Sequence, residues 1–327
     1  MLVVRPTLAE IIEEHKDSLS ESVEIITPNE GSDEEIAQLI TDVDIIVCTR
    51  LSADAVINAK KLKLIQKTGA GVDAMPFEVI KEEIYVANTA GANPVPLAEG
   101  AIALLMSLAK RIVSRHNLFP DRDSQKGTEI RGKNLGIIGM GSIGVEIAKR
   151  MSSFEMNILA IKRQPTEELK EKLGLKFLGG PEDLDYLLTE SDFIILTVPL
   201  TPQTRGLIGE RELQLMKPTS YIINVGRAAL IQEEPFYKAL KEERIAGAGI
   251  DVWWTPHWWD TIWKPHNDKP ANYPIWELPN VIATPHNIGF TEKTIHSDNA
   301  IKIIIENINR IEKGLPPLNT VDKEFQY

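Results

Sequence analysis

The chain has little cysteine, no long apolar run and no basic tract. Among its 327 residues the only cysteine is Cys48, which excludes an internal disulfide bond and is typical of a reducing cytoplasm. No apolar run approaches the roughly 20 residues that a membrane span requires. The apolar run at the start of the sequence is too short to predict a signal peptide. The net charge of −11 and the absence of a basic tract argue against a nucleic-acid partner. From these absences together we expect a cytoplasmic protein that binds neither nucleic acid nor membrane.

Short apolar runs alternate with helical patterns along most of the chain. This alternation predicts parallel sheets and an α/β fold, and the length suggests two domains. In the first hundred residues the runs predict strands at 3–4, 23–26, 45–48, 64–65 and 84–87. Later runs predict six more, the number a complete Rossmann sheet needs, at 135–138, 157–161, 193–198, 221–225, 248–252 and 281–284.

Two helices stand out from this alternation. The segment from Pro94 to Ile112 is apolar nearly all round, which predicts a helix buried in the core or in a subunit interface. From about Thr294 an amphipathic helix is expected near the end of the chain. The spacing of Ser32 and Glu35 is that of a capping box and predicts a helix start.

Residues 135–144 read Leu-Gly-Ile-Ile-Gly-Met-Gly-Ser-Ile-Gly, so an apolar run leads directly into a G-x-G-x-x-G turn. In dinucleotide-binding domains the first glycine allows the tight turn, the second lets backbone approach a pyrophosphate, and the third lets helix pack on strand. A helical pattern follows, whose N-terminus would offer N–H groups to the phosphates. Because a strand and a helix flank the turn, we favour this reading over a turn that binds nothing. The predicted cofactor contacts are Gly139, Gly141, Ser142, Ile143 and Gly144.

The second strand of the expected Rossmann domain ends without an acidic residue. Domains that bind NAD carry an acid about 20 residues after the glycines, on the ribose 2′-OH. Here no Asp or Glu lies between Met156 and Thr166, and Lys162 and Arg163 occupy that place. Cationic side chains suit a 2′-phosphate, and a planar guanidinium suits it best. The pair therefore predicts NADP in preference to NAD, against the alternative of a solvated basic pair.

Two further residues suit hydride transfer to or from a hydroxy or keto acid. That chemistry requires a cation to hold the carboxylate and polarise the carbonyl, and a proton donor that titrates near neutral pH. Arg227 directly follows the predicted strand 221–225, and His286 follows the predicted strand 281–284. Ligands of open α/β sheets bind at the carboxyl ends of the strands. We therefore predict Arg227 and His286 as catalytic residues.

Over nearly its whole length the chain resembles the D-isomer-specific 2-hydroxyacid dehydrogenases. This family includes glyoxylate/hydroxypyruvate reductase, D-lactate dehydrogenase, phosphoglycerate dehydrogenase and formate dehydrogenase. The Arg163-Gln-Pro165 turn resembles that of the NADPH-using glyoxylate/hydroxypyruvate reductases. The motifs that carry the resemblance are K-T-G-A-G-V-D (67–73), L-A-E (97–99), R-G-K-N-L-G-I-I-G (131–139), V-P-L-T-P (198–202), N-V-G-R (224–227), G-I-D-V (249–252), L-P-N (278–280) and T-P-H (284–286).

The resemblance implies two doubly wound parallel-sheet domains, with a Rossmann coenzyme domain inserted in a flavodoxin-like substrate domain. The substrate (catalytic) domain is expected at 1–98 plus 295–327, and the dinucleotide-binding domain at 99–294. The family also implies a homodimer that forms largely through the coenzyme domain.

The resemblance also implies roles for individual residues. The backbone amides of Ala70, Gly71 and Val72 would bind the substrate carboxylate, Arg227 would contact the substrate, and His286 would be the acid/base.

Further cofactor contacts are implied at Pro199, at Thr204 and at Asp251, the last near the nicotinamide. The expected enzyme is an NADP(H)-preferring reductase of small 2-keto acids, such as glyoxylate, hydroxypyruvate or a bulkier acid, that forms the D-2-hydroxy acid. NAD is kept as the alternative cofactor, and no metal is expected.

The chain departs from the family pattern beside the catalytic histidine. Most members have a glutamate five residues after the Asp251 equivalent, where it pairs with the histidine and favours its protonated form. Here that position is Pro256, so the histidine lacks this partner unless another carboxylate replaces it; Asp260, Asp268 and Glu277 are near in sequence. Formate dehydrogenases also lack the acid. Without a partner, His286 is expected to stay protonated over a narrower range, so that keto-acid reduction falls off at lower pH.

All six tryptophans lie between Trp253 and Trp276, in a segment about ten residues longer than is usual in the family. One reading is an aromatic cluster that packs the segment down or seals a dimer contact. The other is an aromatic wall over the substrate pocket, which would favour a bulky keto acid. His257 and His266, in the same segment, could form a metal-binding pair, but we favour two surface histidines because no further metal ligands accompany them.

Two other functions are left open by the sequence. A dinucleotide-sensing regulator without enzymatic activity fits the missing glutamate, but it has no need of Arg227 and His286. A dehydrogenase of the formate or phosphite type also fits the missing glutamate, but it fits the basic residues at 162–163 poorly because such enzymes usually use NAD.

Overall fold

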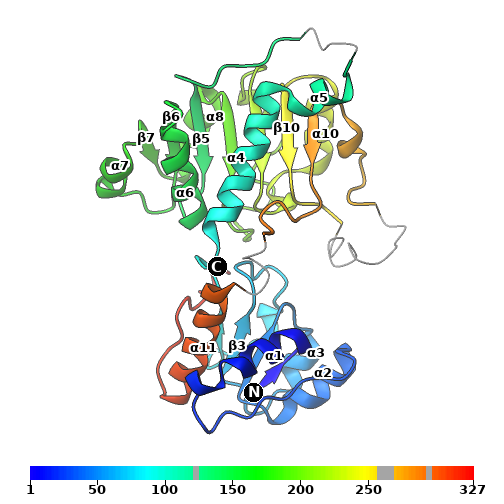
Figure 1. Cartoon of the computed structure of the whole chain (residues 1–327), viewed down its shortest axis with the longest axis vertical. Helices are drawn as coiled ribbons and strands as arrows, with labels where there is room; N and C mark the ends of the chain where they lie inside the picture. Colours follow the sequence, from blue (N-terminus) through cyan, green and yellow to red (C-terminus); the bar gives the residue numbers. More distant parts are fainter. Residues whose placement is uncertain (121–124, 256–268, 292–296) are drawn as a thin grey trace. The chain divides into compact units, whose positions relative to one another are not determined.

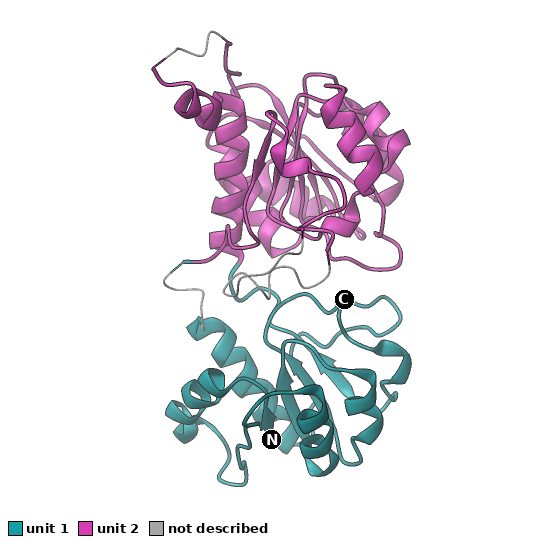
Figure 2. Ribbon diagram, turned by 90° about the vertical axis from the view of Figure 1, so that its right-hand side faces the viewer, with its two compact units in different colours: residues 1–93, 291–327 teal, residues 94–290 magenta. Residues whose placement is uncertain are grey.

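Parallel strands joined by helices form both sheets of this computed structural model, which describes residues 1–120, 125–255, 269–291 and 297–327. The chain divides into unit 1 (1–93 with 291–327) and unit 2 (94–290), coloured separately in Figure 2. The boundary expected after residue 98 would cut helix α4, since unit 2 begins where that helix begins, at Pro94. The boundary expected at 294/295 lies outside the described residues.

Unit 1 contains a four-stranded sheet in the order β1-β2-β3-β4. The strand expected at 23–26 is reduced to one bridge, in which Ile26 pairs with Leu2. The reason is that β1 is only two residues long and offers no longer ladder. With Ile26 counted, the order in chain sequence is 2-1-3-4-5, the flavodoxin-like order. The strands are β1 Leu2–Val3, β2 Ile45–Cys48, β3 Leu64–Lys67 and β4 Tyr85–Ala87.

The helices of unit 1 cover this sheet, and the last of them comes from the far end of the chain. On α11 the buried Asn307 donates to Gln66 Oε1 at 2.7 Å and accepts from the backbone N–H of Leu318 at 2.6 Å. The apolar face of α11 packs against α1 and the sheet through five isoleucines: Ile301, Ile304, Ile305, Ile308 and Ile311. The α-helices in the described part of unit 1 are α1 Pro6–Glu14, α2 Asp33–Leu39, α3 Ala53–Asn58 and α11 Asp298–Glu312.

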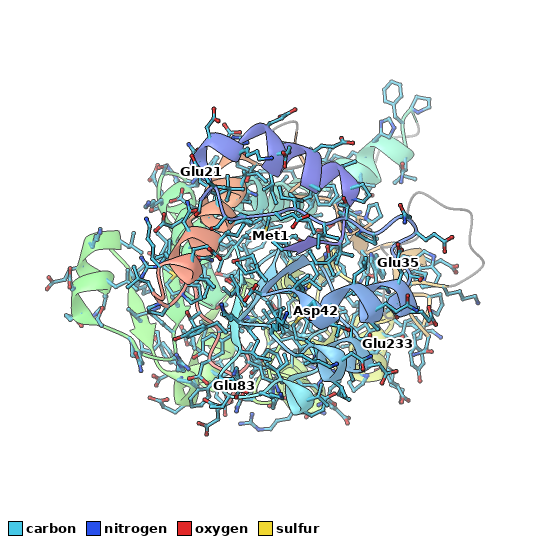
Figure 3. The ribbon with its side chains drawn as sticks, turned by 90° about the horizontal axis from the view of Figure 1, so that it is seen from below. Met1, Glu21, Glu35, Asp42, Glu83 and Glu233 are labelled. Carbon is cyan, nitrogen blue, oxygen red and sulfur yellow. The ribbon has the colours of Figure 1, made fainter. Side chains whose placement is uncertain are left out.

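Local capping begins α2 where the sequence predicts it. The Ser32 side chain accepts from the N–H of Glu35 at 3.2 Å, while the Glu35 carboxylate accepts N–H groups from residues 29, 30 and 31. Those backbone hydrogen bonds lower the pKa of Glu35. Figure 3 labels Glu35 among the acidic side chains that contribute to the net charge of −11.

Unit 2 contains a seven-stranded sheet in the order β11-β10-β9-β8-β5-β6-β7 (Figure 1). Six strands match the predicted runs to within two residues at each end. The expected number of six is wrong, because the edge strand β7 pairs with β6 through only three residues, Phe-Leu-Gly, too short a run to predict a strand. The strands are β5 Asn134–Ile138, β6 Asn157–Ile161, β7 Phe177–Gly179, β8 Phe193–Leu196, β9 Tyr221–Asn224, β10 Gly247–Ile250 and β11 Val281–Ala283.

Helix α4 packs against α6 and against strands β9 and β10 (Figure 1). It ends at Lys110, two residues before the predicted end, because Arg111 adopts a left-handed conformation with φ 56°. Within the described residues, no helix combines the length and the apolar character that a membrane span requires. The helices of unit 2 are α4 Pro94–Lys110, α5 Ile112–Asn117, α6 Ser142–Ser152, α7 Glu167–Leu173, α8 Leu184–Glu190, α9 Glu210–Leu215 and α10 Glu233–Lys241.

Candidate active site

The carboxyl ends of the strands of unit 2 lie level with one another. One row of paired residues crosses all seven strands near these ends: Gly179, Ile161, Ile138, Leu196, Asn224, Ile250 and Ala283. The residues that follow this row therefore share one edge of the sheet, where open α/β sheets bind ligands. The glycine turn begins directly after this row, and Lys162, Arg227, Asp251 and His286 all follow it within three residues.

The glycine turn links β5 to α6 and shows three different glycine environments. Gly139 has φ +109°, and a Cβ there would lie 2.7 Å from the backbone N of Val198. A Cβ on Gly144 would collide with the carbonyl oxygen of Gly139, whereas a Cβ on Gly141 would meet nothing within 4 Å. The first and third glycines are thus required by packing inside the protein, and the second faces open space. The first-turn N–H groups of α6, at Ser142 and Ile143, begin beside that space.

The two basic residues after β6 have different surroundings. Lys162 is partly buried, and its ammonium donates to the carbonyl oxygen of Met140 in the glycine turn at 3.3 Å. Arg163 is exposed. Lys162 therefore braces the turn, and the arginine is the better placed of the two to meet a group that projects from solvent.

The segment after β8 closes the other side of the glycine turn. The Thr197 hydroxyl donates to the carbonyl oxygen of Gly139 at 2.6 Å. Farther on, the Thr204 hydroxyl donates to the carbonyl oxygen of Pro199 at 2.7 Å and accepts from the N–H of Thr201 at 2.8 Å. The expected cofactor contacts Pro199 and Thr204 therefore belong to one braced loop.

Arg227 follows β9 in a turn that a buried asparagine holds. Asn224, 1% exposed, donates to the carbonyl oxygen of Arg227 at 2.9 Å and accepts from the N–H of Gly226 at 3.1 Å. The backbone N–H of Asp251 donates to the carbonyl oxygen of Asn224 at 3.1 Å and so ties this turn to β10. Asn224 thereby fixes the backbone from which the guanidinium projects.

His286 follows β11 in a turn that Asp251 clamps. The Asp251 Oδ1 atom accepts from the Thr284 hydroxyl at 2.6 Å and from the N–H groups of Asn287 and Ile288 at 3.0 and 3.1 Å. His286 has φ +59°, a left-handed conformation that costs a residue with a Cβ roughly 1–3 kcal/mol. Hydrogen bonds on both sides of His286 therefore hold it in a conformation that it would not adopt alone.

Close packing on α4 holds the same turn from the other side. A Cβ on Gly100 would lie 2.7 Å from the carbonyl oxygen of Ile288, and one on Gly289 would lie 3.2 Å from Leu97 Cδ1. The absence of side chains at these two glycines lets the chain after His286 lie directly against the helix.

Burial dominates the ionisation of Asp251. The residue is 4% exposed, and desolvation raises the pKa of its carboxyl group to about 6 against the lowering effect of its hydrogen bonds. The carboxylate form is thus costly to keep in this position.

Three of the six tryptophans lie in the described residues, and these three pack into unit 2. Trp253 donates from its indole N–H to the carbonyl oxygen of Thr284, and Trp254 donates to that of Ile231, both at 2.9 Å. Trp276 meets the Trp253 ring edge-on, with centroids 6.2 Å apart. The other residues of interest in this segment lie outside the described residues: Pro256, His257, Trp258, Trp259, Asp260, Trp263, His266 and Asp268.

Glu277 does not lie beside His286. It ends a short 3-10 helix, Ile275–Glu277, that precedes β11, whereas His286 follows β11. Glu277 lines a cavity of about 500 Å³ together with Tyr221 and Ala246, which stand at the starts of β9 and β10. It is therefore at the opposite edge of the sheet from the histidine.

In unit 1 the expected carboxylate-binding loop follows β3. The Asn88 side chain donates to the carbonyl oxygen of Ala70 at 2.9 Å, and the N–H of Thr89 donates to that of Gly69 at 3.3 Å. Ala70 is exposed, Gly71 is partly exposed, and the Val72 side chain is buried in the core of the unit. Side-chain burial on one side thus leaves the loop backbone at the surface.

A family model described as the D-isomer specific 2-hydroxyacid dehydrogenase NAD binding domain matches residues 102–287, more than half of the chain. The chain belongs to the D-isomer specific 2-hydroxyacid dehydrogenase family. It is 34% identical to a glyoxylate reductase of Thermococcus litoralis over 302 residues, which cover 89% of this chain and 85% of the relative.

Two further relatives show the range of this 2-hydroxyacid dehydrogenase family. The chain is 34% identical to a D-3-phosphoglycerate dehydrogenase of Methanocaldococcus jannaschii over 94% of its own length, but it spans only 58% of that relative. Its fold is similar to the NAD-complexed D-isomer specific 2-hydroxyacid dehydrogenase of Lactobacillus delbrueckii ssp. bulgaricus. That structure has a TM-score of 0.76 at 25% identity, with 98% of this chain and 100% of the other covered.

The sequence did not reveal the residues that hold the candidate site in place. Thr284, Asn224 and Thr197 each bond to a turn that carries a candidate residue. Thr284 lies within the T-P-H motif, and Asn224 lies within the N-V-G-R motif. Membership of these motifs was the sequence signal that could have identified Thr284 and Asn224 as residues of the site.

Proposed function

We propose that this protein is an NADP(H)-preferring oxidoreductase that interconverts a small 2-keto acid and the corresponding D-2-hydroxy acid. The observation that carries the proposal is the shared edge of unit 2, where Arg227, Asp251 and His286 follow three adjacent strands and the glycine turn follows a fourth. Relatives named glyoxylate reductase and D-3-phosphoglycerate dehydrogenase support this chemistry, and glyoxylate- or hydroxypyruvate-type acids are the first substrates to test.

The residues divide the chemistry among them. A reduced nicotinamide supplies the hydride, and the open space at Gly141 beside the start of α6 suits its pyrophosphate. Arg227 provides a permanent cation for the substrate carboxylate and carbonyl. The His286 imidazole donates a proton to the carbonyl oxygen during reduction and accepts it back during oxidation.

The preference for NADP rests on Arg163. Arg163→Ala should raise the KM for NADPH roughly ten-fold or more, the loss expected for one charge-assisted contact, and should change that for NADH little. Lys162→Ala is the matched control: because Lys162 braces the glycine turn, it should weaken both cofactors alike. Equal effects of Arg163→Ala on the two cofactors would refute the preference.

The activity is tested by NADPH and NADH oxidation with glyoxylate, hydroxypyruvate and phenylpyruvate. We expect turnover of at least one keto acid, lost in His286→Ala while NADPH still binds. Binding of NADPH without turnover of any acid would instead favour the sensor. NAD reduction by formate or phosphite, with no keto-acid turnover, would favour a dehydrogenase of the formate or phosphite type.

Exposed apolar side chains support the expected homodimer. Ile112, Val113 and Phe119, at and just after α5, are 54%, 41% and 83% exposed. Such neighbouring apolar exposure suits burial against a second copy. Native mass spectrometry should show a dimer that Val113→Glu weakens, and a monomer at micromolar concentration would count against it.

A further inference from the structure

We infer that Trp253 is a positioning residue for His286, acting through the backbone of Thr284. The inference rests on the proposed reductase function, in which the His286 imidazole moves a proton. Trp253 lies two residues after Asp251, in the segment that follows β10. His286 instead lies in the segment that follows β11.

Trp253 is itself held rigidly. Its side chain is 5% exposed and forms part of the core of unit 2. Its ring meets that of Trp276 edge-on at an interplanar angle of 77°. From this fixed position the indole N–H donates to the carbonyl oxygen of Thr284 at 2.9 Å. The hydrogen bond therefore connects a buried, closely packed ring to the chain two residues before His286.

Thr284 transmits this constraint to His286. Its carbonyl oxygen, which has two lone pairs, also accepts from the backbone N–H of His286 at 3.1 Å. Its own N–H donates to the carbonyl oxygen of Ile250 at 2.8 Å, and its hydroxyl donates to Asp251. Every polar group of Thr284 is thus engaged, and the carbonyl that Trp253 fixes is the one that closes the turn on His286.

The neighbouring Trp254 provides a matched control. Its indole N–H also donates to a backbone carbonyl at 2.9 Å, that of Ile231, and its ring packs against Phe236 with centroids 6.1 Å apart. Ile231 lies between the short 3-10 helix Ala228–Leu230 and α10, outside the turn that carries His286. Removal of the indole N–H therefore eliminates the same kind of hydrogen bond from both tryptophans. Only at Trp253 does that hydrogen bond reach the turn that carries His286.

The experiment removes the indole N–H alone. Incorporation of β-(3-benzothienyl)alanine at 253 or at 254 replaces the N–H by sulfur and keeps the ring, so folding is preserved; Trp253→Phe and Trp254→Phe are the genetically encoded pair. Because a displacement of about 1 Å costs about 100-fold, we expect the loss of one hydrogen bond at 253 to lower kcat roughly ten-fold. The KM for NADPH should stay within about two-fold, and the 254 variants should keep kcat.

A second readout does not depend on activity. Hydrogen exchange at the backbone amides of His286 and Asn287 should be faster in the 253 variants and unchanged in the 254 variants. Equal kcat losses at both positions, or unchanged exchange at 286 and 287 in the 253 variants, would overturn the inference. If the unmodified protein reduces no keto acid, the proposed function fails, but the exchange rates still decide whether Trp253 holds the turn.

Discussion

Replacing Asp251 by asparagine should stabilise the protein at alkaline pH although it removes a charge from the candidate site. Burial raises the pKa of the Asp251 carboxyl group from 3.8 to about 6, despite three hydrogen bonds to Oδ1. The shift is about 2 pKa units, and each unit corresponds to about 1.4 kcal/mol, so the ionised form costs the native state about 3 kcal/mol.

The sign follows from proton binding. Between pH 3.8 and about 6 the native state binds more protons at this carboxyl group than the unfolded state does. The free energy of unfolding therefore falls as the pH rises through this window and stays low above it. Asp251→Asn keeps the shape and an oxygen acceptor but no longer ionises. Its advantage should reach up to about 3 kcal/mol at pH 8 and should vanish near pH 4.

Urea unfolding of the cofactor-free protein measures this difference. Tryptophan fluorescence is the probe, because all six tryptophans lie within the sequence of unit 2. Glu277→Gln, which neutralises an exposed carboxylate of the same unit, is the control and should change the free energy by at most about 0.5 kcal/mol. If Asp251→Asn is less stable than the parent at pH 8, or if the difference does not change with pH, the hydrogen bonds outweigh burial and the reasoning is wrong.

Two further predictions concern the turns of the candidate site. Gly144→Ala should lower stability by about 1–3 kcal/mol because its Cβ collides with the Gly139 carbonyl, whereas Gly141→Ala should keep the melting temperature and weaken NADPH binding, measured by calorimetry. Equal melting temperatures for the two variants would contradict this. Asn224→Ala should raise the KM for the keto acid more than that for NADPH in steady-state kinetics, since it releases the Arg227 turn; a parallel rise of both would count against that role.

Most strands of unit 2 could be predicted because they contain apolar runs. The run at 157–161 coincides with β6 at both ends, and in unit 1 the run at 45–48 coincides with β2 at both ends. β7 was missed because an edge strand of three residues gives no such run. Ile26 was overpredicted because the length of a strand depends on its partner as well as on its own residues.

The candidate site could be predicted only in part. Arg227 and His286 were found because polar residues that directly follow buried strands meet at one sheet edge. The contacts that hold them join residues such as Asp251 and Thr284, which are 33 positions apart, and only the strand pairing brings these together. Glu277 is near His286 in sequence but not in the structure, because strand β11 separates the two residues and leaves them at opposite edges of the sheet.

The contact of Leu97 with Gly289 has a consequence for the order in which the chain assembles. These residues stand near the two ends of unit 2, so folding of that unit brings its ends together. Docking of α11 onto β3 must close a loop of about 200 residues if unit 2 is unfolded, at an entropic cost of about 5 kcal/mol. A folded unit 2 replaces that loop with a short connection. Unit 1 is therefore expected to gain its last helix, α11, after unit 2 has folded. Folding of the inserted unit 2 thus lowers the entropic cost of completing unit 1.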